Sequence, residues 1–343
     1  MVKREKIKII LFLAIFLVLL VSVSYIVRTN GSVKDRFAGF YAEKKNTIDV
    51  VMFGASPVAT SFSPGYIWKN YGIKTYPLST NSQRPMAISY LLDEAYKYQD
   101  PKVVVIELRM FTYPDQEMAV DEPHIREVTD NMRYSLQRIK TVNALTKELD
   151  QKYTYVFDIF KFHSNWKMFF LPKELGKFYY RQYDPRKGFE FSDVIIPQDE
   201  GTDVAMNQTM DIPKEQESVL VGLMEQLKEN DQKALFIVTP EVNTTEYESM
   251  MNKIGGIVEE QGFQFLNLND HYAEMNFDFS TDMKDGVHTN ILGAAKCSDY
   301  LGDYLQQTYG IEKDENEQMD QRWEDCYLLF QQEYLAALEK TKQ

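Results

Sequence analysis

Hydrophobic positions along the chain form short continuous runs that alternate with longer runs at helical spacing. Five short apolar runs have the length and the flanking turn residues of buried β-strands: 48–53, 73–78, 103–108, 234–240 and 263–268. Helical spacing appears over 63–70, 85–99, 214–230, 246–261 and 290–307. The alternation predicts an α/β domain, placed at 47–310, with a parallel sheet and right-handed crossovers. Pro77 is awkward for a central strand because it has no backbone N–H.

Two regions depart from this alternation. Residues 112–213 are rich in Tyr, Phe and Lys and contain one clear helical pattern at 124–147. We interpret them as an insertion that caps or flanks the sheet, whose aromatic residues either pack in the ordinary way or line a groove for a sugar or acyl group. Residues 311–343 are predicted to form an acidic helical tail that packs back on the domain through its apolar side chains: Trp323, Tyr327, Leu328, Phe330 and Tyr334.

The N-terminus carries the longest apolar run. Residues 9–27 contain no charge, and about nineteen helical residues at roughly 1.5 Å each span a hydrocarbon layer. Lys and Arg residues in the tail at 1–8 predict that this end stays in the cytoplasm. A cleaved signal peptide is the competing interpretation, but the run exceeds the usual apolar region of roughly 7–15 residues. We therefore predict a single-pass anchor in the cell membrane, a juxtamembrane stalk at 28–46 and an extracytoplasmic domain.

Composition narrows the choice of partners. The net charge of −13 over 343 residues argues against nucleic-acid binding, because the chain repels phosphates. The only cysteines, Cys297 and Cys326, have no zinc-ligand spacing, and the sequence leaves open whether they pair. No nucleotide-binding glycine motif is present either. We expect no metal and no organic cofactor.

A serine follows the first predicted strand in the segment Phe53–Pro57, FGASP. Ser56 lies in the turn before the next helix, where a parallel sheet places its active site. A hydroxyl there is a candidate nucleophile, and the backbone N–H groups that follow it form part of an oxyanion hole. A plain helix cap explains the serine equally well when it is taken alone.

The second candidate segment, DGVHTN, precedes the last core helix. Asp285 and His288 are three residues apart, so the carboxylate can accept a hydrogen bond from one ring nitrogen while the other faces a serine. Taken alone, this spacing is more typical of a capped turn. The other three histidines, His124, His163 and His271, lack the strand-end context.

Together these segments resemble the SGNH, or GDSL-like, hydrolase superfamily. The first block of that family matches Gly54-Ala55-Ser56, and its last block matches the dyad Asp285 and His288 within residues 276–305. The resemblance covers about 40–110 and 215–307. Within this superfamily, the sequence is similar to the membrane-linked branch, whose members work beside membrane-bound O-acyltransferases, as in the D-alanylation of teichoic acids. It implies a flavodoxin-like three-layer sandwich, with Ser56 as nucleophile, His288 as base and Asp285 as its orienting carboxylate.

The sequence departs from the family pattern at several places. Ser79 replaces the glycine whose N–H completes the oxyanion hole, and Pro57 stands where this branch often has histidine. No asparagine follows the third strand, where Glu107 and Arg109 occur instead. The resemblance therefore implies oxyanion or substrate-binding roles for a set of substitutes: Ser79, Asn81, Gln83 and Arg109.

We expect an extracytoplasmic serine esterase or O-acyltransferase that acts on acyl esters of cell-envelope polymers. Its substrate would be an envelope glycan or polyol, and a membrane-bound O-acyltransferase is a candidate partner. The departures at Pro57 and Ser79 favour an alternative, in which the domain is a catalytically inactive scaffold for such an acyltransferase.

Overall fold

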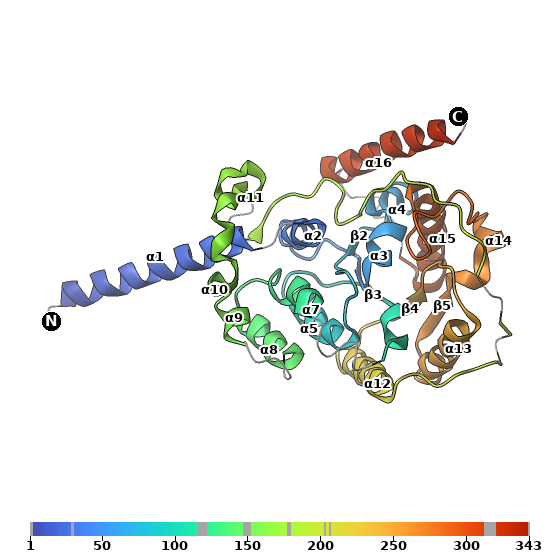
Figure 1. Cartoon of the computed structure of the whole chain (residues 1–343), viewed down its shortest axis with the longest axis horizontal. Coiled ribbons are helices and arrows are strands. Elements are labelled where there is room, and N and C mark those ends of the chain that lie inside the picture. The colour runs from blue at the N-terminus through green and yellow to red at the C-terminus, as the bar shows by residue number, and fades with distance from the viewer. Residues whose placement is uncertain are drawn as a thin grey trace.

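A computed structural model describes residues 3–28, 31–114, 122–146, 152–176, 180–201, 204–205, 207–311 and 320–341. Its centre is a five-stranded parallel sheet in the order β2-β1-β3-β4-β5 (Figure 1). The strands are β1 (Val50–Phe53), β2 (Thr75–Pro77), β3 (Val103–Glu107), β4 (Ala234–Val238) and β5 (Gln264–Asn267). They confirm all five predicted strands and the α/β class. Parts of the predicted insertion and of the C-terminal tail, 312–319 among them, lie outside the described residues.

Helices cover both faces of the sheet, which explains why its inner strands are apolar throughout. Alternate residues of β3 enter different cores: Val104 and Ile106 one, Val103 and Val105 the other. The first core is completed by α5 (Pro85–Ala95), α12 (Lys214–Glu229) and α13 (Thr245–Glu260). The second is completed by α3 (Ser56–Ser61), α4 (Pro64–Tyr71) and α15 (Ile291–Tyr309).

The edge position of β2 accommodates Pro77. This residue pairs with Met52 of β1, and the following Leu78 N–H donates to the Met52 carbonyl at 2.7 Å. Because β2 has a neighbour on one side only, proline's missing donor costs no ladder hydrogen bond there.

The predicted insertion is more helical than its sequence pattern indicated. The single helix expected at 124–147 is two helices, α7 (Glu122–Thr129) and α8 (Leu136–Leu145). A turn separates them because Ser135 caps α8 by accepting from the N–H of Arg138 at 3.2 Å. Short elements follow: α9 (Tyr153–Val156), α10 (Ile159–Phe162), η2 (His163–Phe170) and α11 (Pro172–Gly176).

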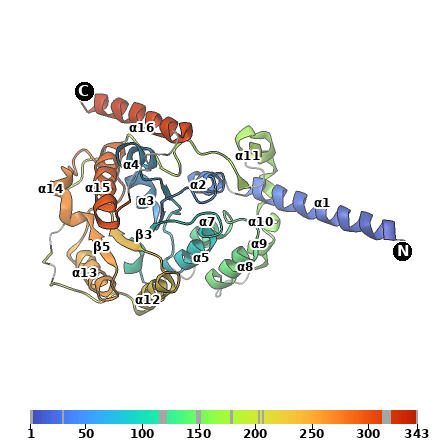
Figure 2. The same ribbon diagram turned by 180° about the vertical axis from the view of Figure 1, so that it is seen from behind.

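The two ends of the chain behave differently. Helix α1 (Lys3–Val27) projects from the domain and is the one helix in the described residues that is long and apolar enough to cross a membrane (Figures 1 and 2). The expected stalk at 28–46 is instead folded: α2 (Ser32–Phe40) buries Phe37 and Phe40 in the first core. The polar pattern of this segment predicts a stalk, but its charged side chains Lys34 and Arg36 are also buried and paired within the domain.

The acidic tail contains α16 (Gln321–Lys340), which packs against α4 and α15. Trp323 and Phe330 are buried as expected, whereas Leu328 remains half exposed. Cys297 and Cys326 are both buried and free, so they form no disulfide.

Candidate active site

The turn after β1 presents Ser56 at the first position of α3. This turn depends on Gly54, whose φ of 145° is rare for residues with a side chain. A Cβ on Gly54 would also lie 2.5 Å from the Cβ of Glu107. The chain therefore bends sharply between strand and helix, and Ser56 begins a helix at the carboxyl end of the sheet.

The loop before α15 holds the histidine and its carboxylate. An isolated antiparallel bridge joins Met283 to Thr289, and the Lys284 N–H donates to the His288 carbonyl at 2.8 Å. Asp285 Oδ1 accepts from the backbone N–H groups of Val287 and His288, each at 2.9 Å. The carboxylate is thus fixed by the backbone of its own turn, independently of the imidazole.

These two segments meet in the folded chain. Ser56 Oγ lies 2.7 Å from His288 Nε2, and His288 Nδ1 lies 2.9 Å from Asp285 Oδ1 and 3.0 Å from Oδ2. The side chain of His288 is 25% exposed, so the site is open to a ligand. Of the sequence-predicted residues, the structure brings this triad into the order hydroxyl, imidazole, carboxylate, which is the arrangement of a nucleophile, a base and an orienting group.

The environment of Asp285 favours its ionised form. Partial burial alone would raise the pKa of this carboxyl, but the N–H of Val287 and the positive charge available on His288 outweigh it and lower the pKa. An ionised Asp285 accepts a hydrogen bond from Nδ1, which leaves the lone pair of Nε2 directed at Ser56.

Glu107, the last residue of β3, belongs to the site, although its sequence context predicts no role for it. Its Oε2 accepts from the Ala55 N–H at 3.0 Å and its Oε1 from the Arg109 N–H at 2.6 Å. Burial raises its pKa, and the two N–H groups oppose that rise. The only sequence signal was an acidic residue that closes an otherwise apolar strand.

Gln83 also belongs to the serine turn. Its Oε1 accepts from the Gly54 N–H at 2.9 Å, while its buried Nε2 has no hydrogen-bond partner in the described residues. A buried donor without an acceptor is unusual in a folded protein. Ser79 is fully buried, and its carbonyl accepts from Arg36 at 2.8 Å. No contact in the described residues ties Ser79 to Ser56.

The structure does not bring Asn81 to the triad. Asn81 donates from its backbone N and its Nδ2 to the carboxylate of Glu127, at 2.8 and 2.9 Å. Both residues line a separate cavity of about 450 Å³. The cause is the chain direction after Ser79, which turns toward α7.

Arg109 lies near the serine turn but its charge is balanced. It forms an ion pair with the buried Glu241 and donates to the Tyr113 hydroxyl at 2.9 Å. Tyr113 in turn packs against Ala55. The predicted substrate-binding role therefore has no free charge to act through, and Arg109 anchors the wall beside Ser56.

The described residues contain no group of three or more His, Cys, Asp or Glu side chains that could hold a metal ion. In comparisons with known proteins, no family model matches the chain and no curated protein matches its sequence. The interpretation of the site therefore depends on its residues and their geometry.

Proposed function

We propose that this protein is a serine esterase or O-acyltransferase of the SGNH type. The observation that carries the proposal is the contact of 2.7 Å between Ser56 Oγ and His288 Nε2, with Asp285 on the other ring nitrogen. The strand order supports it, since flavodoxin-like doubly wound sheets have the same order, 2-1-3-4-5, and bind ligands beyond their strand ends.

The proposed reaction passes through an acyl-enzyme. Ser56 Oγ attacks the ester carbonyl carbon while His288 Nε2 takes the hydroxyl proton, and the carbonyl electrons move to its oxygen. Collapse of this intermediate breaks the ester bond, and His288 gives its proton to the leaving alcohol. Water then releases the acid, or a hydroxyl of a glycan or polyol takes the acyl group, by the same steps in reverse.

The developing oxyanion needs hydrogen-bond donors. The Ala55 N–H is occupied by Glu107, so the Ser56 N–H at the start of α3 is the nearest backbone candidate. Gln83 Nε2 is the second, because it is buried, unpartnered and held beside Gly54 by its own amide oxygen. Ser79 remains a candidate third donor on the strength of the family resemblance alone.

The anchor suggests where the reaction takes place. With α1 in the cell membrane and the basic residues before it in the cytoplasm, the domain would lie outside, next to envelope polymers and membrane-bound O-acyltransferases. In the alternative function, the domain is an inactive scaffold for such an acyltransferase; the departures from the family pattern at Pro57 and Ser79 favour it.

The test is covalent labelling of the full chain with a fluorophosphonate, which reacts with activated serines. We expect the label on the peptide that carries Ser56, and no label in Ser56→Ala. Ser192→Ala is the matched control, because that serine lies outside the triad and should leave the labelling unchanged. A folded wild-type protein that takes no label, combined with normal envelope acylation in cells that carry Ser56→Ala, would reject the enzyme and favour the scaffold.

A further inference from the structure

Large apolar side chains are exposed along one stretch of the predicted insertion. We call the elements α9, α10, η2 and α11, residues 153–176, the collar. Seven of its apolar side chains are between 43% and 72% exposed: Tyr153, Phe157, Phe160, Trp166, Phe170, Leu171 and Leu175. Water-exposed protein surfaces rarely have so many large apolar side chains in so short a segment, so this surface is more stable in contact with an apolar environment.

The charges of the collar also distinguish it from the rest of an acidic chain. Its acidic residues, Asp158 and Glu174, are buried and paired with Arg28 and Lys34. The exposed charges are lysines: Lys161, Lys167 and Lys173. Two of them also pair with acidic side chains outside the collar, Lys161 with Glu122 and Lys173 with Asp35. Exposed aromatic residues interspersed with lysine are typical of the interface between membrane and water, where anionic headgroups attract the ammonium groups.

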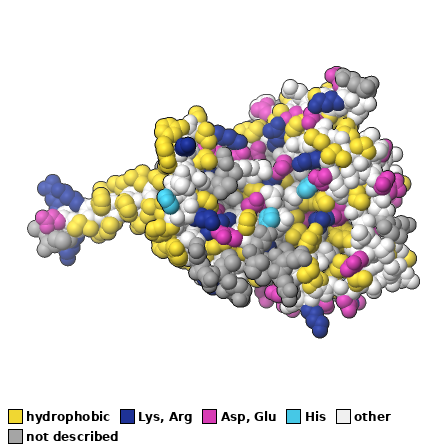
Figure 3. Space-filling view, viewed as in Figure 1, with side chains coloured by type: hydrophobic (Ala, Val, Ile, Leu, Met, Phe, Trp, Pro, Cys, Tyr) yellow, Lys and Arg dark blue, Asp and Glu magenta, His cyan; other side chains and the backbone are white. Residues whose placement is uncertain are grey.

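The collar packs against the end of α1 through α10 and η2. The last turns of α1 are buried from Ser24 to Val27, and Asn165 of η2 donates to the Val27 carbonyl at 3.1 Å. Figures 1 and 2 both show α9, α10 and α11 at the place where α1 meets the domain. The space-filling view shows hydrophobic side chains continuing from α1 onto this part of the surface (Figure 3).

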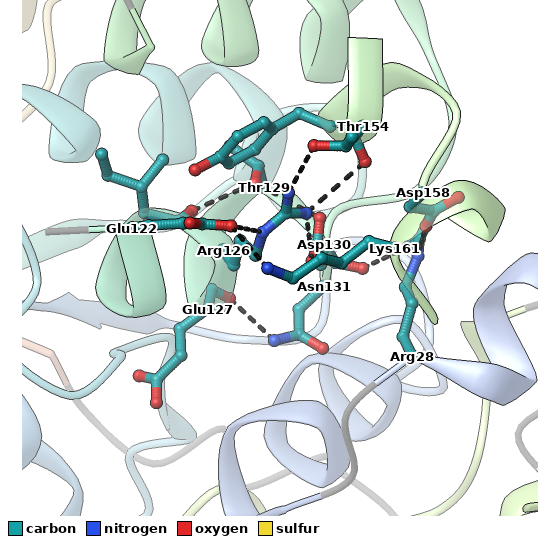
Figure 4. A network of polar contacts seen from close by, with 12 residues as sticks. Arg28, Glu122, Arg126, Glu127, Thr129, Asp130, Asn131, Thr154, Asp158 and Lys161 are labelled. Atoms are coloured by element: carbon teal, nitrogen blue, oxygen red, sulfur yellow. Dashed lines mark hydrogen bonds and ion pairs between the residues drawn. The ribbon is translucent and has the colours of Figure 1, made fainter. Parts of the chain in front are cut away.

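A buried network of charges fixes α1 to the collar (Figure 4). Arg28, directly after α1, pairs with Asp158 at the start of α10 and donates to the Asp130 carbonyl. Arg126 of α7 donates to Thr154 Oγ1 of α9 at 2.7 Å. Because these groups are buried and mutually paired, the depth of α1 in a membrane sets the depth of the collar.

The length of α1 determines that depth. Of its apolar run, residues 9–19 are exposed, and residues 20–27 are partly or fully covered by the domain. The exposed part is about 16 Å long at roughly 1.5 Å per residue, whereas the hydrocarbon layer is about 30 Å thick. The remaining distance is about 14 Å, and the eight covered residues supply about 12 Å of it. This places the collar at the level of the outer leaflet.

From these observations we propose that the collar is a membrane-interface surface whose occupant is the lipid bilayer. Its aromatic and leucine side chains enter the headgroup and upper acyl region, and Lys167 contacts the headgroups. The domain is then held close to the membrane in one orientation and does not swing on a stalk. This inference requires α1 to lie in the bilayer, and it does not depend on the activity of Ser56.

Tryptophan fluorescence tests the proposal, because Trp68 and Trp323 are buried and Trp166 is 55% exposed on the collar. The full chain is reconstituted in vesicles of phosphatidylcholine and phosphatidylglycerol with or without brominated acyl chains, which quench tryptophan on contact. We expect quenching in the wild type and its loss in Trp166→Phe. Flotation with the vesicles tests the anchor separately, and protein that fails to float would also overturn the proposal.

A matched control places the tryptophan on another exposed apolar position. Leu335 on α16 is 54% exposed, so Leu335→Trp in the Trp166→Phe background has a comparable side chain away from the collar. We expect no quenching of this variant by brominated lipid. Equal quenching of both tryptophans would overturn the proposal, as would a floating wild type whose Trp166 is shielded from lipid by a second copy of the chain.

Discussion

The chain contains two pairs of histidine and carboxylate with the same spacing but different surroundings. His288 Nδ1 lies 2.9 Å from Asp285 Oδ1, and His271 Nδ1 lies 2.5 Å from Glu274 Oε2. The histidine side chains are also similarly exposed, at 25% and 30%. The pairs differ in what the imidazole meets: His288 contacts Ser56, whereas His271 stacks on the ring of Tyr300 with centroids 5.2 Å apart.

This difference shows that spacing does not define a site in this protein. Both pairs come after the last strand in sequence, but only the loop before α15 folds back onto the segment that follows β1. The bridge between Met283 and Thr289 shapes this loop, and Thr289 Oγ1 donates to the Thr60 carbonyl at 3.0 Å. The hydroxyl partner comes from 232 residues away, so local sequence carries no record of it.

The largest contrast is expected when each imidazole is removed. His288→Ala should reduce the rate of fluorophosphonate labelling at Ser56 by roughly 10²–10⁴-fold, the usual contribution of a general base. His271→Ala should leave the rate unchanged, since that ring contacts no nucleophile. Labelling that survives His288→Ala unchanged would remove the distinction between the two pairs and the case for His288 as base.

A smaller contrast is expected for the carboxylates. Asp285→Asn should slow labelling, but less than His288→Ala does, because the imidazole remains with its tautomer no longer fixed. Glu274→Gln is the control with the same chemical change and should have no effect on the rate. Labelling kinetics of the two variants decide the matter, and a loss in Asp285→Asn larger than in His288→Ala would contradict the assigned roles.

Removing one carboxylate oxygen of Glu107, which accepts from the serine turn, should have a moderate effect on the free energy of unfolding. Glu107→Gln leaves either Ala55 or Arg109 without an acceptor, because glutamine offers one oxygen where glutamate offers two. An unsatisfied buried N–H costs about 1–3 kcal/mol in the free energy of unfolding. Labelling should slow as well. Glu127→Gln, which loses a similar double contact with Asn81, should spare the labelling rate; slowing there would indicate a general loss of structure.

The pH dependence of stability offers a further test of Glu107. Its folded pKa is raised by burial, so the folded state binds this proton more tightly than the unfolded state does. Its contribution to stability should therefore fall as the pH rises from the usual glutamate range through the raised pKa. The difference in free energy of unfolding between wild type and Glu107→Gln, measured across that interval, isolates this group. A difference that is independent of pH would contradict the raised pKa.

The smallest expected effect is on the pKa values of the two carboxylates, which are lowered by different groups. The hydrogen bond from His271 is the main cause of the lowered pKa of Glu274, so His271→Ala should raise that pKa. Among the groups that lower the pKa of Asp285, the N–H of Val287 comes first, so His288→Ala should leave it partly lowered. Carbon-13 NMR titration of the side-chain carboxyls measures both; equal shifts would show that the backbone of the turn does not hold Asp285.

The sequence alone determined the five strands of this protein and the candidates for its chemistry. Apolar runs of strand length gave the five parallel strands, because a doubly covered sheet requires side chains that are apolar on both faces. The same pattern located Ser56 and His288 in turns beside strands or core helices. The uncharged run at 9–27 identified α1, since length and hydropathy are local properties that need no partner.

Tertiary structure decided which side chains meet. The stalk prediction was wrong because Arg28, Lys34 and Arg36 look solvent-exposed in sequence, whereas in the fold they are buried and form ion pairs with carboxylates 130 or more residues away. Asn81 was predicted at the site, yet the fold turns it toward Glu127. Glu107 showed no function until β3 brought it under the serine turn. In each instance a polar side chain is satisfied by a distant partner, and periodicity reports burial and local shape but not the identity of that partner.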